Sequence, residues 1–489
     1  MKKNLFICLL LSTLYSNAQG ISDALRYAQE NPQGTARFNA MGGAFGAIGG
    51  DLSAMSINPA GGAVFTSSQF AVSLGNFNTS NSSSYFGTTS SDSGNRFDLN
   101  QLGTVVPIRN YDPKSDWKRF SFGVNYDLVN SFNNSTSVTG TNPYHSIADY
   151  FTYYANLLGG IPLSNLQASS YYFPDFAYMD QQAWLGYNGY LINPAVGNPA
   201  SNNLYDPAIK GGNYRQTNTV NNTGYNGKLA FNFSGQVYDW MYVGINLNSY
   251  FNDYKQSSRF SESNPNGNPN VNGFYQDLHT YGNGFSFQLG TIIKITKEFR
   301  VGANYTSPVW YRFTDELSQR LNTSSAAVNP GYTMVFEPYK LQTPQSFLLS
   351  AAYVYNKQGI ISVDYGVKEY SDMRFKPKNQ FSDVNSAMDK QFTTSNSFRV
   401  GWEHKIKHLS VRAGYRWEQS PYIDKSVMGD LTGYSTGFGY HFQDYKIDVA
   451  YSYTQQDYQL SLLSAGVTET ALTKVKNNAV TATFTYIFR

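Results

Sequence analysis

The stretch "LSVRAGYRW", residues 409–417, alternates between apolar side chains and polar or small ones. Because successive side chains of a strand point to opposite faces, the stretch predicts a β-strand with one apolar and one polar face. The same alternation recurs at 299–305, 447–453 and 480–488. We therefore expect an all-β protein in which most strands have one apolar face.

The spacing of these segments indicates what kind of β protein it is. Fourteen strands are predicted, at 68–79, 96–108, 118–130, 225–236, 241–255, 279–295, 299–313, 344–356, 360–373, 395–405, 409–419, 434–442, 445–457 and 477–488. From the fourth strand on, short connections such as "VYDW", "TKE" and "QD" alternate with long ones. A soluble sandwich also alternates apolar and polar residues, but only an outer-membrane barrel sorts its loops into tight periplasmic turns and long outer loops. Since an unpaired edge is not tolerated in hydrocarbon, we predict a closed transmembrane β-barrel of about 14 antiparallel strands.

Composition agrees with a barrel and excludes several classes of partner. Charged residues are 14% of the chain, well below the ~25% of ordinary soluble domains, whereas 16% of the residues are aromatic. The formal net charge is only +3, and no basic stripe is present, so we expect no nucleic-acid partner.

The first eighteen residues predict a secretory signal peptide that is cleaved. Lys2 and Lys3 precede the apolar run 5–11, and small residues follow at 16–18. Cleavage would also remove Cys8, the only cysteine, which excludes disulfides, cysteine metal sites and cysteine nucleophiles from the mature protein.

The polar faces of the predicted strands are expected to line the lumen, because an Arg facing lipid at mid-depth costs roughly 2–4 kcal/mol. The charged residues assigned to the lumen are Asp364, Lys368, Arg399, Glu403, Arg412, Arg416, Glu418, His441 and Asp448.

One predicted outer loop, 131–224, is too long to lack structure. Within it "SIADYFTYYANLLGG" predicts an amphipathic helix after a Ser146 cap, with Tyr150, Phe151, Tyr154, Leu157 and Leu158 on its apolar face. Either this loop is a packed cap over the barrel mouth, or these side chains line a groove that captures a greasy ligand.

The segment before the first strand, residues 19–65, is expected to fold inside the barrel as a plug, here called the hatch. Its stretch 42–65, "GGAFGAIGGDLSAMSINPAGGAVF", holds seven glycines and five alanines, and small side chains permit close approach to another surface. The domain organisation is therefore signal peptide 1–18, hatch 19–65 and barrel 66–489.

These segments carry a family resemblance. The stretch "MGGAFGAIGGDLSAMSINPAGGAVF" resembles the hatch of FadL/TodX-type outer-membrane transporters, the long-chain fatty-acid transport family. The stretches "FRVGANYTSPVWYRF", "FRVGWEHKIKHLSVRAGYRWEQSPY" and "TGYSTGFGYHFQDYKIDVAYSYT" are similar to strands of that family. The resemblance covers most of the chain but is poor over 131–224.

The resemblance implies a monomeric barrel in the lipid of the outer membrane of a Gram-negative cell, with an N-terminal hatch. It implies passive uptake of long-chain fatty acids or other hydrophobic molecules, captured by outer loops and released through a lateral gap at a kinked third strand, here 119–129. Asn58, Pro59 and Ala60 match the hatch motif.

A fatty acid in the lumen needs cations for its carboxylate, because an unpaired carboxylate away from water is strongly disfavoured. The candidates with lumenal parity are Lys368, Arg399, Arg412 and Arg416. The competing interpretation is that they pair with Asp364, Glu403 or Glu418 and hold strands and hatch together.

A second possible function is haem capture, since proteins similar to this family are sometimes labelled hemin receptors. The five histidines are His145, His279, His404, His408 and His441. No catalytic grouping, phosphate loop, cofactor motif or metal site stands out, so we expect neither an enzyme nor a bound cofactor. The run "NPNGNPNVNG" has no carboxylate to bind calcium.

Overall fold

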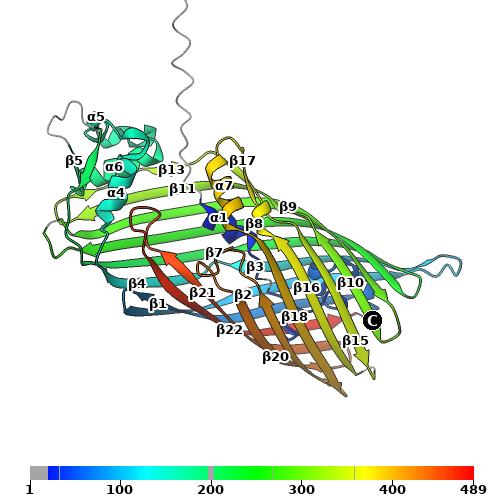
Figure 1. Cartoon of the computed structure of the whole chain (residues 1–489). Coiled ribbons are helices and arrows are strands. Elements are labelled where there is room, and N and C mark those ends of the chain that lie inside the picture. The colour runs from blue at the N-terminus through cyan, green and yellow to red at the C-terminus, as the bar shows by residue number, and fades with distance from the viewer. Residues whose placement is uncertain (1–19, 32, 196–202, 268, 357, 489) are drawn as a thin grey trace, which may run out of the picture.

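The computed structural model describes residues 20–31, 33–195, 203–267, 269–356 and 358–488, so the expected signal peptide lies outside the described residues. Fourteen strands form one closed antiparallel barrel. The barrel closes where the first strand pairs with the last, with Gln69 opposite Ile487. The predicted fold class is confirmed (Figure 1). The barrel strands are β1 (Gln69–Tyr85), β2 (Thr88–Arg109), β3 (Trp117–Ser131), β7 (Tyr214–Val237), β8 (Met241–Ser263), β9 (Val271–Lys294), β10 (Phe299–Thr306), β15 (Ser346–Tyr355), β16 (Gly359–Glu369), β18 (Thr394–Ile406), β19 (Leu409–Glu418), β20 (Leu431–His441), β21 (Tyr445–Ser461) and β22 (Thr470–Ile487).

The barrel wall is apolar outside and polar inside, as the alternation predicts. Exposed side chains on the outer face include Leu349, Tyr365, Trp402 and Phe438. On the other face of β18 and β19, Glu403 and Arg412 are 1% and 4% exposed. Among the described residues, none of the helices combines the length and apolarity that crossing a membrane requires.

Several strand boundaries differ from the prediction. β7 begins at Tyr214 rather than at 225, β8 continues to Ser263 rather than ending at 255, and β9 begins at Val271 rather than at 279, so the loop between β8 and β9 spans only 264–270. β22 begins at Thr470 rather than at 477. The first hairpin is longer, because β1 and β2 continue to the two-residue turn Phe86-Gly87, where both φ angles are positive. This part is rich in Ser, Thr and Asn, so it shows no apolar alternation. The strand predicted at 299–313 is divided into β10 and β11 (Trp310–Thr323) around Pro308, which has no N–H to donate to a ladder.

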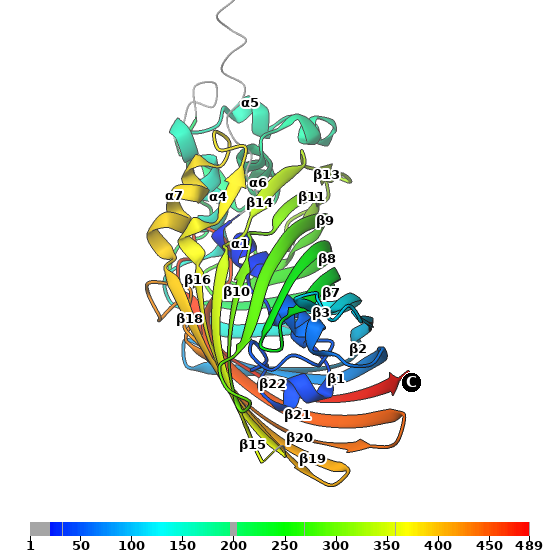
Figure 2. The same cartoon turned by 90° about the vertical axis from the view of Figure 1, so that its right-hand side faces the viewer.

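The outer loops carry the remaining elements. A cap covers one side of the barrel mouth and contains α4 (Ile147–Ala155), α5 (Leu163–Leu166), α6 (Tyr178–Asn188), β5 (Ile192–Pro194) and β6 (Tyr205–Pro207) (Figure 1). The other loop strands are β4 (Asn134–Asn142), β12 (Ala327–Val328), β13 (Thr333–Val335), β14 (Tyr339–Gln342) and β17 (Arg374–Lys376). The helix α7 (Ser382–Gln391) lies over the mouth beside the N-terminal helix (Figure 2).

The N-terminal segment lies within the ring of strands (Figure 2). It consists of α1 (Ile21–Ala28), α2 (Ala36–Ala40), α3 (Ala54–Ile57) and a 3-10 helix, η1 (Pro59–Val64). The backbone N–H groups of Phe45 and Gly46 donate to the Asp364 carboxylate on β16 at 3.0 and 3.1 Å. We keep the name hatch for described residues 20–65.

Candidate functional site

The hatch backbone packs against glycines of the barrel wall. A Cβ atom at Gly302 on β10 would lie 2.3 Å from the Gly46 carbonyl oxygen, and one at Gly414 on β19 would lie 2.2 Å from the Gly42 nitrogen. Real Cβ atoms do not approach backbone this closely, so only glycine fits at these wall positions. The small residues of the hatch therefore meet small residues of the wall.

The Asn-Pro-Ala motif holds the middle of the hatch. Asn58 is 1% exposed, and its Nδ2 donates to the carbonyl oxygens of Gly46 at 2.8 Å and of Thr291, on β9, at 2.9 Å. Its Oδ1 accepts from Ala60 N at 3.1 Å and so caps η1, whose first residue is Pro59. The motif thus links two parts of the hatch to the wall.

Replacing Asn58 by alanine should loosen the hatch, because two buried carbonyl oxygens lose a donor. We expect a loss of about 1–3 kcal/mol in hatch stability, measured as faster proteolysis of residues 20–65 in the folded barrel. Asn329→Ala, in an exposed loop, is the control. Equal protection of the hatch in both variants would contradict the role of Asn58.

A chain of buried ion pairs also connects hatch and wall. Arg37 of α2 donates to both carboxylate oxygens of Glu403, from Nε at 2.8 Å and from Nη2 at 3.0 Å. Arg412 donates to Glu403 at 2.6 Å and to Asp448 at 2.6 Å. The predicted candidate Arg412 thus lies in the pairing network that was the competing interpretation for these cations.

The other three candidate cations lie higher in the lumen. Lys368 Nζ donates to the Ala28 carbonyl oxygen at 2.7 Å, and Arg416 Nη2 donates to Asn31 Oδ1 at 2.8 Å. Arg399 pairs with Glu418 at 3.3 Å. The Nε groups of Arg399 and Arg416 are buried and have no hydrogen-bond partner among the described residues. Each of these two side chains therefore keeps one N–H group without an acceptor.

Arg399 and Arg416 line a cavity of about 210 Å³ between the hatch and the wall, here called the inner cavity. Arg96 of β2 lines it too, paired with Asp98 at 2.8 Å and lying over the Phe77 ring. Sequence reasoning missed Arg96, which stands at the edge of a predicted strand. The inner cavity therefore brings together three guanidinium groups.

A larger cavity of about 560 Å³, the outer cavity, lies above α1 and beneath the cap. Its lining mixes aromatic and aliphatic side chains with polar ones. The apolar group includes Tyr154, Phe274 and Leu317, and the polar group includes the amide of Asn218, the hydroxyl of Ser258 and the charged Asp23 and Arg26. Asn134 lines both cavities, so both reach the start of β4.

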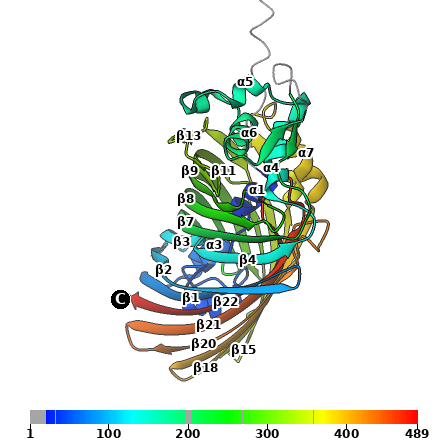
Figure 3. The same ribbon diagram turned by 90° about the vertical axis from the view of Figure 1, so that its left-hand side faces the viewer.

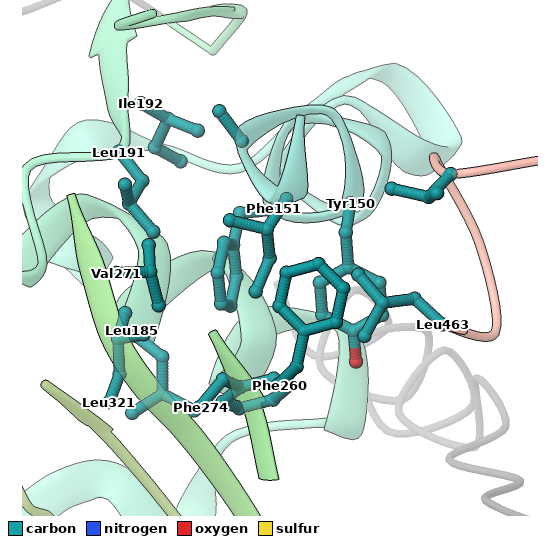
Figure 4. Close-up of a cluster of buried hydrophobic side chains, with 14 of the residues drawn as sticks. Tyr150, Phe151, Leu185, Leu191, Ile192, Phe260, Val271, Phe274, Leu321 and Leu463 are labelled. Carbon is teal, nitrogen blue, oxygen red and sulfur yellow. The ribbon is translucent and has the colours of Figure 1, made fainter. Parts of the chain in front are cut away.

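The predicted cap helix is present as α4, but its apolar face is largely packed. Ser146 caps it, with Oγ accepting from Ala148 N at 3.1 Å. Tyr150 and Phe151 are at most 1% exposed and pack on Phe260, Phe274 and Leu463 (Figure 4). Burial raises the pKa of the Tyr150 hydroxyl well above its usual range, so the hydroxyl stays protonated and donates to Gln182 Oε1.

The remaining predicted groove residues diverge from this core. Tyr154 is partly buried and reaches the outer cavity. The helix ends at Ala155, before Leu157, and Leu158 turns to a positive φ of 55° with 71% of its surface exposed. The five residues do not form one groove.

The backbone ladder of the wall is interrupted at the third strand. β2 pairs with β3 only from Gln101 opposite Asp127 to Arg109 opposite Arg119. β3 ends at Ser131, and β4, which continues its course, pairs with β7 (Figure 3). The sequence had not located this break.

Side chains bridge the interruption instead of backbone. Ser90 Oγ donates to the Ser137 carbonyl oxygen at 2.6 Å, and Ser137 N donates to Asp92 at 2.6 Å. Phe97, on the part of β2 that pairs with β1 but not with β3, is 66% exposed. The inner cavity reaches this place, since Arg96 and Asn133 both line it.

The histidines are placed away from both cavities, as none of the five is among the described residues that line them. His145 contacts Glu469 at 2.7 Å, and His279 contacts Asp253 at 2.9 Å. His404 stacks on Tyr355. His408 and His441 lie at the opposite, short-turn end of the barrel.

Sequence comparison identifies the family. Residues 195–488 match the model of the family described as outer membrane protein transport protein (OMPP1/FadL/TodX). The chain belongs to this family. Membership of the OMPP1/FadL/TodX family and the barrel confirm the predicted resemblance and place the protein in the outer membrane. Its family is one of transport proteins. A comparison with curated proteins found no match.

Solved structures share the fold at low identity. A FadL homologue of Pseudomonas aeruginosa is 13% identical, with a TM-score of 0.57 over 94% of this chain and 99% of that one. The toluene transporter TbuX of Ralstonia pickettii is 14% identical, with a TM-score of 0.50 over 94% of this chain and 100% of that one. The toluene transporter TodX of Pseudomonas putida is 15% identical, with a TM-score of 0.50 over 93% and 98%.

Proposed function

We propose that this FadL/TodX-family protein is a passive outer-membrane channel for hydrophobic amphiphiles, foremost long-chain fatty acids. The observation that carries the proposal is the inner cavity, where Arg399 and Arg416 keep unpaired donors beside the interrupted third strand. A carboxylate out of water requires charge-assisted hydrogen bonds, which guanidinium groups provide. A hydrocarbon such as toluene, the substrate named for two structural relatives, has no group that could accept hydrogen bonds from these guanidinium groups.

Cargo would enter through the outer cavity. Its volume of about 560 Å³ falls within the ~300–1,000 Å³ typical of small-molecule sites. The mixed lining suits a molecule with an apolar tail and a polar head. The packing of Tyr150 and Phe151 supports a structural role for most of α4, and Tyr154, which lines the outer cavity, would be its contribution to capture.

Cargo would then pass Asn134 into the inner cavity and leave sideways between β2 and β4. The route needs only side-chain bridges to separate there, whereas elsewhere a backbone ladder would have to break. The exposed Phe97 indicates that the lower part of the interruption lies at bilayer depth. The hatch closes the straight path to the periplasm.

A disulfide across the interruption tests this route. Cys8 is the only native cysteine and lies in the expected signal peptide, so Ser90→Cys/Ser137→Cys introduces a single pair. Cells producing the wild-type protein should take up labelled palmitate faster than cells without it. Oxidation of the double variant should stop this uptake, and reduction should restore it.

The single variants are the controls, because neither can form the disulfide. Palmitate uptake that is unchanged by oxidation would contradict lateral release. Uptake of toluene or of haem without any uptake of palmitate would contradict the proposed cargo, and the haem result would favour the alternative of a haem receptor.

A further inference from the structure

A third cavity, of about 290 Å³, opens at the short-turn end of the barrel, which is the periplasmic end in outer-membrane barrels. One side is the hatch loop at Gly49, Gly50 and Asp51. The other is formed by the ends of β18 to β21. We call it the periplasmic cavity; it lies on the far side of the hatch from the inner cavity.

The wall of the periplasmic cavity has a surplus of positive charge. Six lysine and arginine side chains line it against three carboxylates, a formal surplus of three, and two histidines add to it when protonated. The cations are Arg37, Arg300, Lys405, Lys407, Arg412 and Lys446, the carboxylates Asp51, Glu403 and Asp448, and the histidines His408 and His441.

The carboxylates are already engaged. Glu403 and Asp448 bind the guanidinium groups of Arg37 and Arg412. Asp51 accepts hydrogen bonds from Thr35 Oγ1 and Ser53 N, both at 2.9 Å. The surplus therefore belongs to the other cations.

Those other cations have no carboxylate partner among the described residues. Within the described part of the chain, the ammonium groups of Lys405, Lys407 and Lys446 make no ion pair or hydrogen bond. Arg300 donates from Nη1 to the Ile48 carbonyl oxygen at 3.3 Å, but its Nε is buried without a partner.

Two of the lysines face the lumen rather than the lipid. Lys405 stands two residues after Glu403 on β18, and Lys446 two residues before Asp448 on β21. Side chains two apart on a strand share a face, so each lysine lies on the face of a buried carboxylate that binds the hatch network. A lysine at the barrel rim that reaches outward to lipid headgroups would instead stand on the other, lipid-facing side of the strand.

Like charges gathered around a concave, low-dielectric wall raise the local concentration of anions. Lysine is a common point-charge ligand of phosphate, and a phosphate carries more negative charge than a carboxylate and so matches a surplus of three better. We propose that the periplasmic cavity binds a phosphate group, supplied either by free phosphate of the periplasm or by the headgroup of a phospholipid in the inner leaflet.

The test uses the full barrel in a neutral maltoside detergent, free of phosphate. Inorganic phosphate is titrated calorimetrically in one arm, and phosphatidylglycerol in mixed micelles in the other. Lys405→Gln/Lys446→Gln should weaken binding about tenfold or more. Lys425→Gln/Lys474→Gln, which changes the charge equally but at ion-paired lysines elsewhere, should leave binding unchanged.

If inorganic phosphate binds saturably and the Lys405→Gln/Lys446→Gln variant loses this binding, the proposal is supported with free phosphate as the source. Binding of phosphatidylglycerol alone, lost in the same variant, supports it with the lipid as the source. Failure of both ligands to bind, or equal binding by both variants, would overturn it. Because both lysines lie beyond the hatch from Arg399 and Arg416, none of these results depends on which cargo the channel carries.

Discussion

Glu403→Gln is expected to release the hatch from the barrel wall. The Glu403 carboxylate is 1% exposed and neutralises Arg37 of the hatch together with Arg412 of β19. Without its charge, Arg412 keeps only Asp448 as an ionic partner, and Arg37 keeps only the Gly50 carbonyl oxygen as a charge-independent acceptor. Breaking a buried pair in this way costs about 3–5 kcal/mol. The barrel should survive, because its own closure rests on the backbone ladder.

Release would be seen as rapid proteolysis of residues 20–65 and as increased ion conductance across a planar bilayer. Glu418→Gln is the matched control, because Glu418 pairs with Arg399 at 3.3 Å and is partly exposed. Its effect should stay below about 1 kcal/mol. A Glu403→Gln protein with a protected hatch and wild-type conductance would contradict the role of this ion-pair chain.

Gly302→Leu should prevent the hatch from seating at all. A Cβ atom there would meet the Gly46 carbonyl oxygen at 2.3 Å and the Ala47 Cα at 3.2 Å. These are backbone atoms, which cannot turn aside as a flexible side chain would. Overpacking a filled interior costs about 1–3 kcal/mol or more, and here the hatch can avoid the clash by leaving. We expect the conductance of an open barrel.

Gly94→Leu is the control for this variant, since a Cβ atom at Gly94 meets nothing within 4 Å. It should conduct like the wild type and keep its hatch protected from protease. If Gly302→Leu behaves in the same way, then the hatch does not pack on β10.

The alternation at 409–417 was sufficient to predict β19 and the direction of its side chains. Arg412 is buried on the lumenal face, and the strand pairs with both of its neighbours in register. The alternation of short and long loops then predicted that the barrel is closed and that it spans the outer membrane. These features could be read because period-two patterning and loop length are local properties of the sequence.

The features that the sequence did not reveal depend on distant contacts. Arg37 and Glu403 are 366 residues apart, so nothing local marks them as partners. The break between Ser131 and Asn134 lies between two strands, β3 and β4, that both pair with β7, and β7 lies beyond the whole cap. The polar hairpin that ends at Phe86 is held by backbone pairing, and its side chains carry no apolar pattern.

The candidate cations separate into two groups that the sequence could not distinguish. Arg412 is fully engaged in holding hatch and wall, whereas Arg399 and Arg416 keep free donors at the inner cavity. The alternation of side chains along the strands places all of these candidate cations in the lumen. Only the position of the hatch decides which of them a ligand could reach.

The affinity of the purified protein for palmitate and for its methyl ester measures the headgroup site directly. We expect the acid to bind about tenfold more tightly than the ester, because only the acid offers a carboxylate to Arg399 and Arg416. Arg399→Gln/Arg416→Gln should abolish the difference, and Arg320→Gln, at an exposed arginine, should keep it. Equal binding of acid and ester by the wild-type protein would contradict a fatty-acid site in the inner cavity.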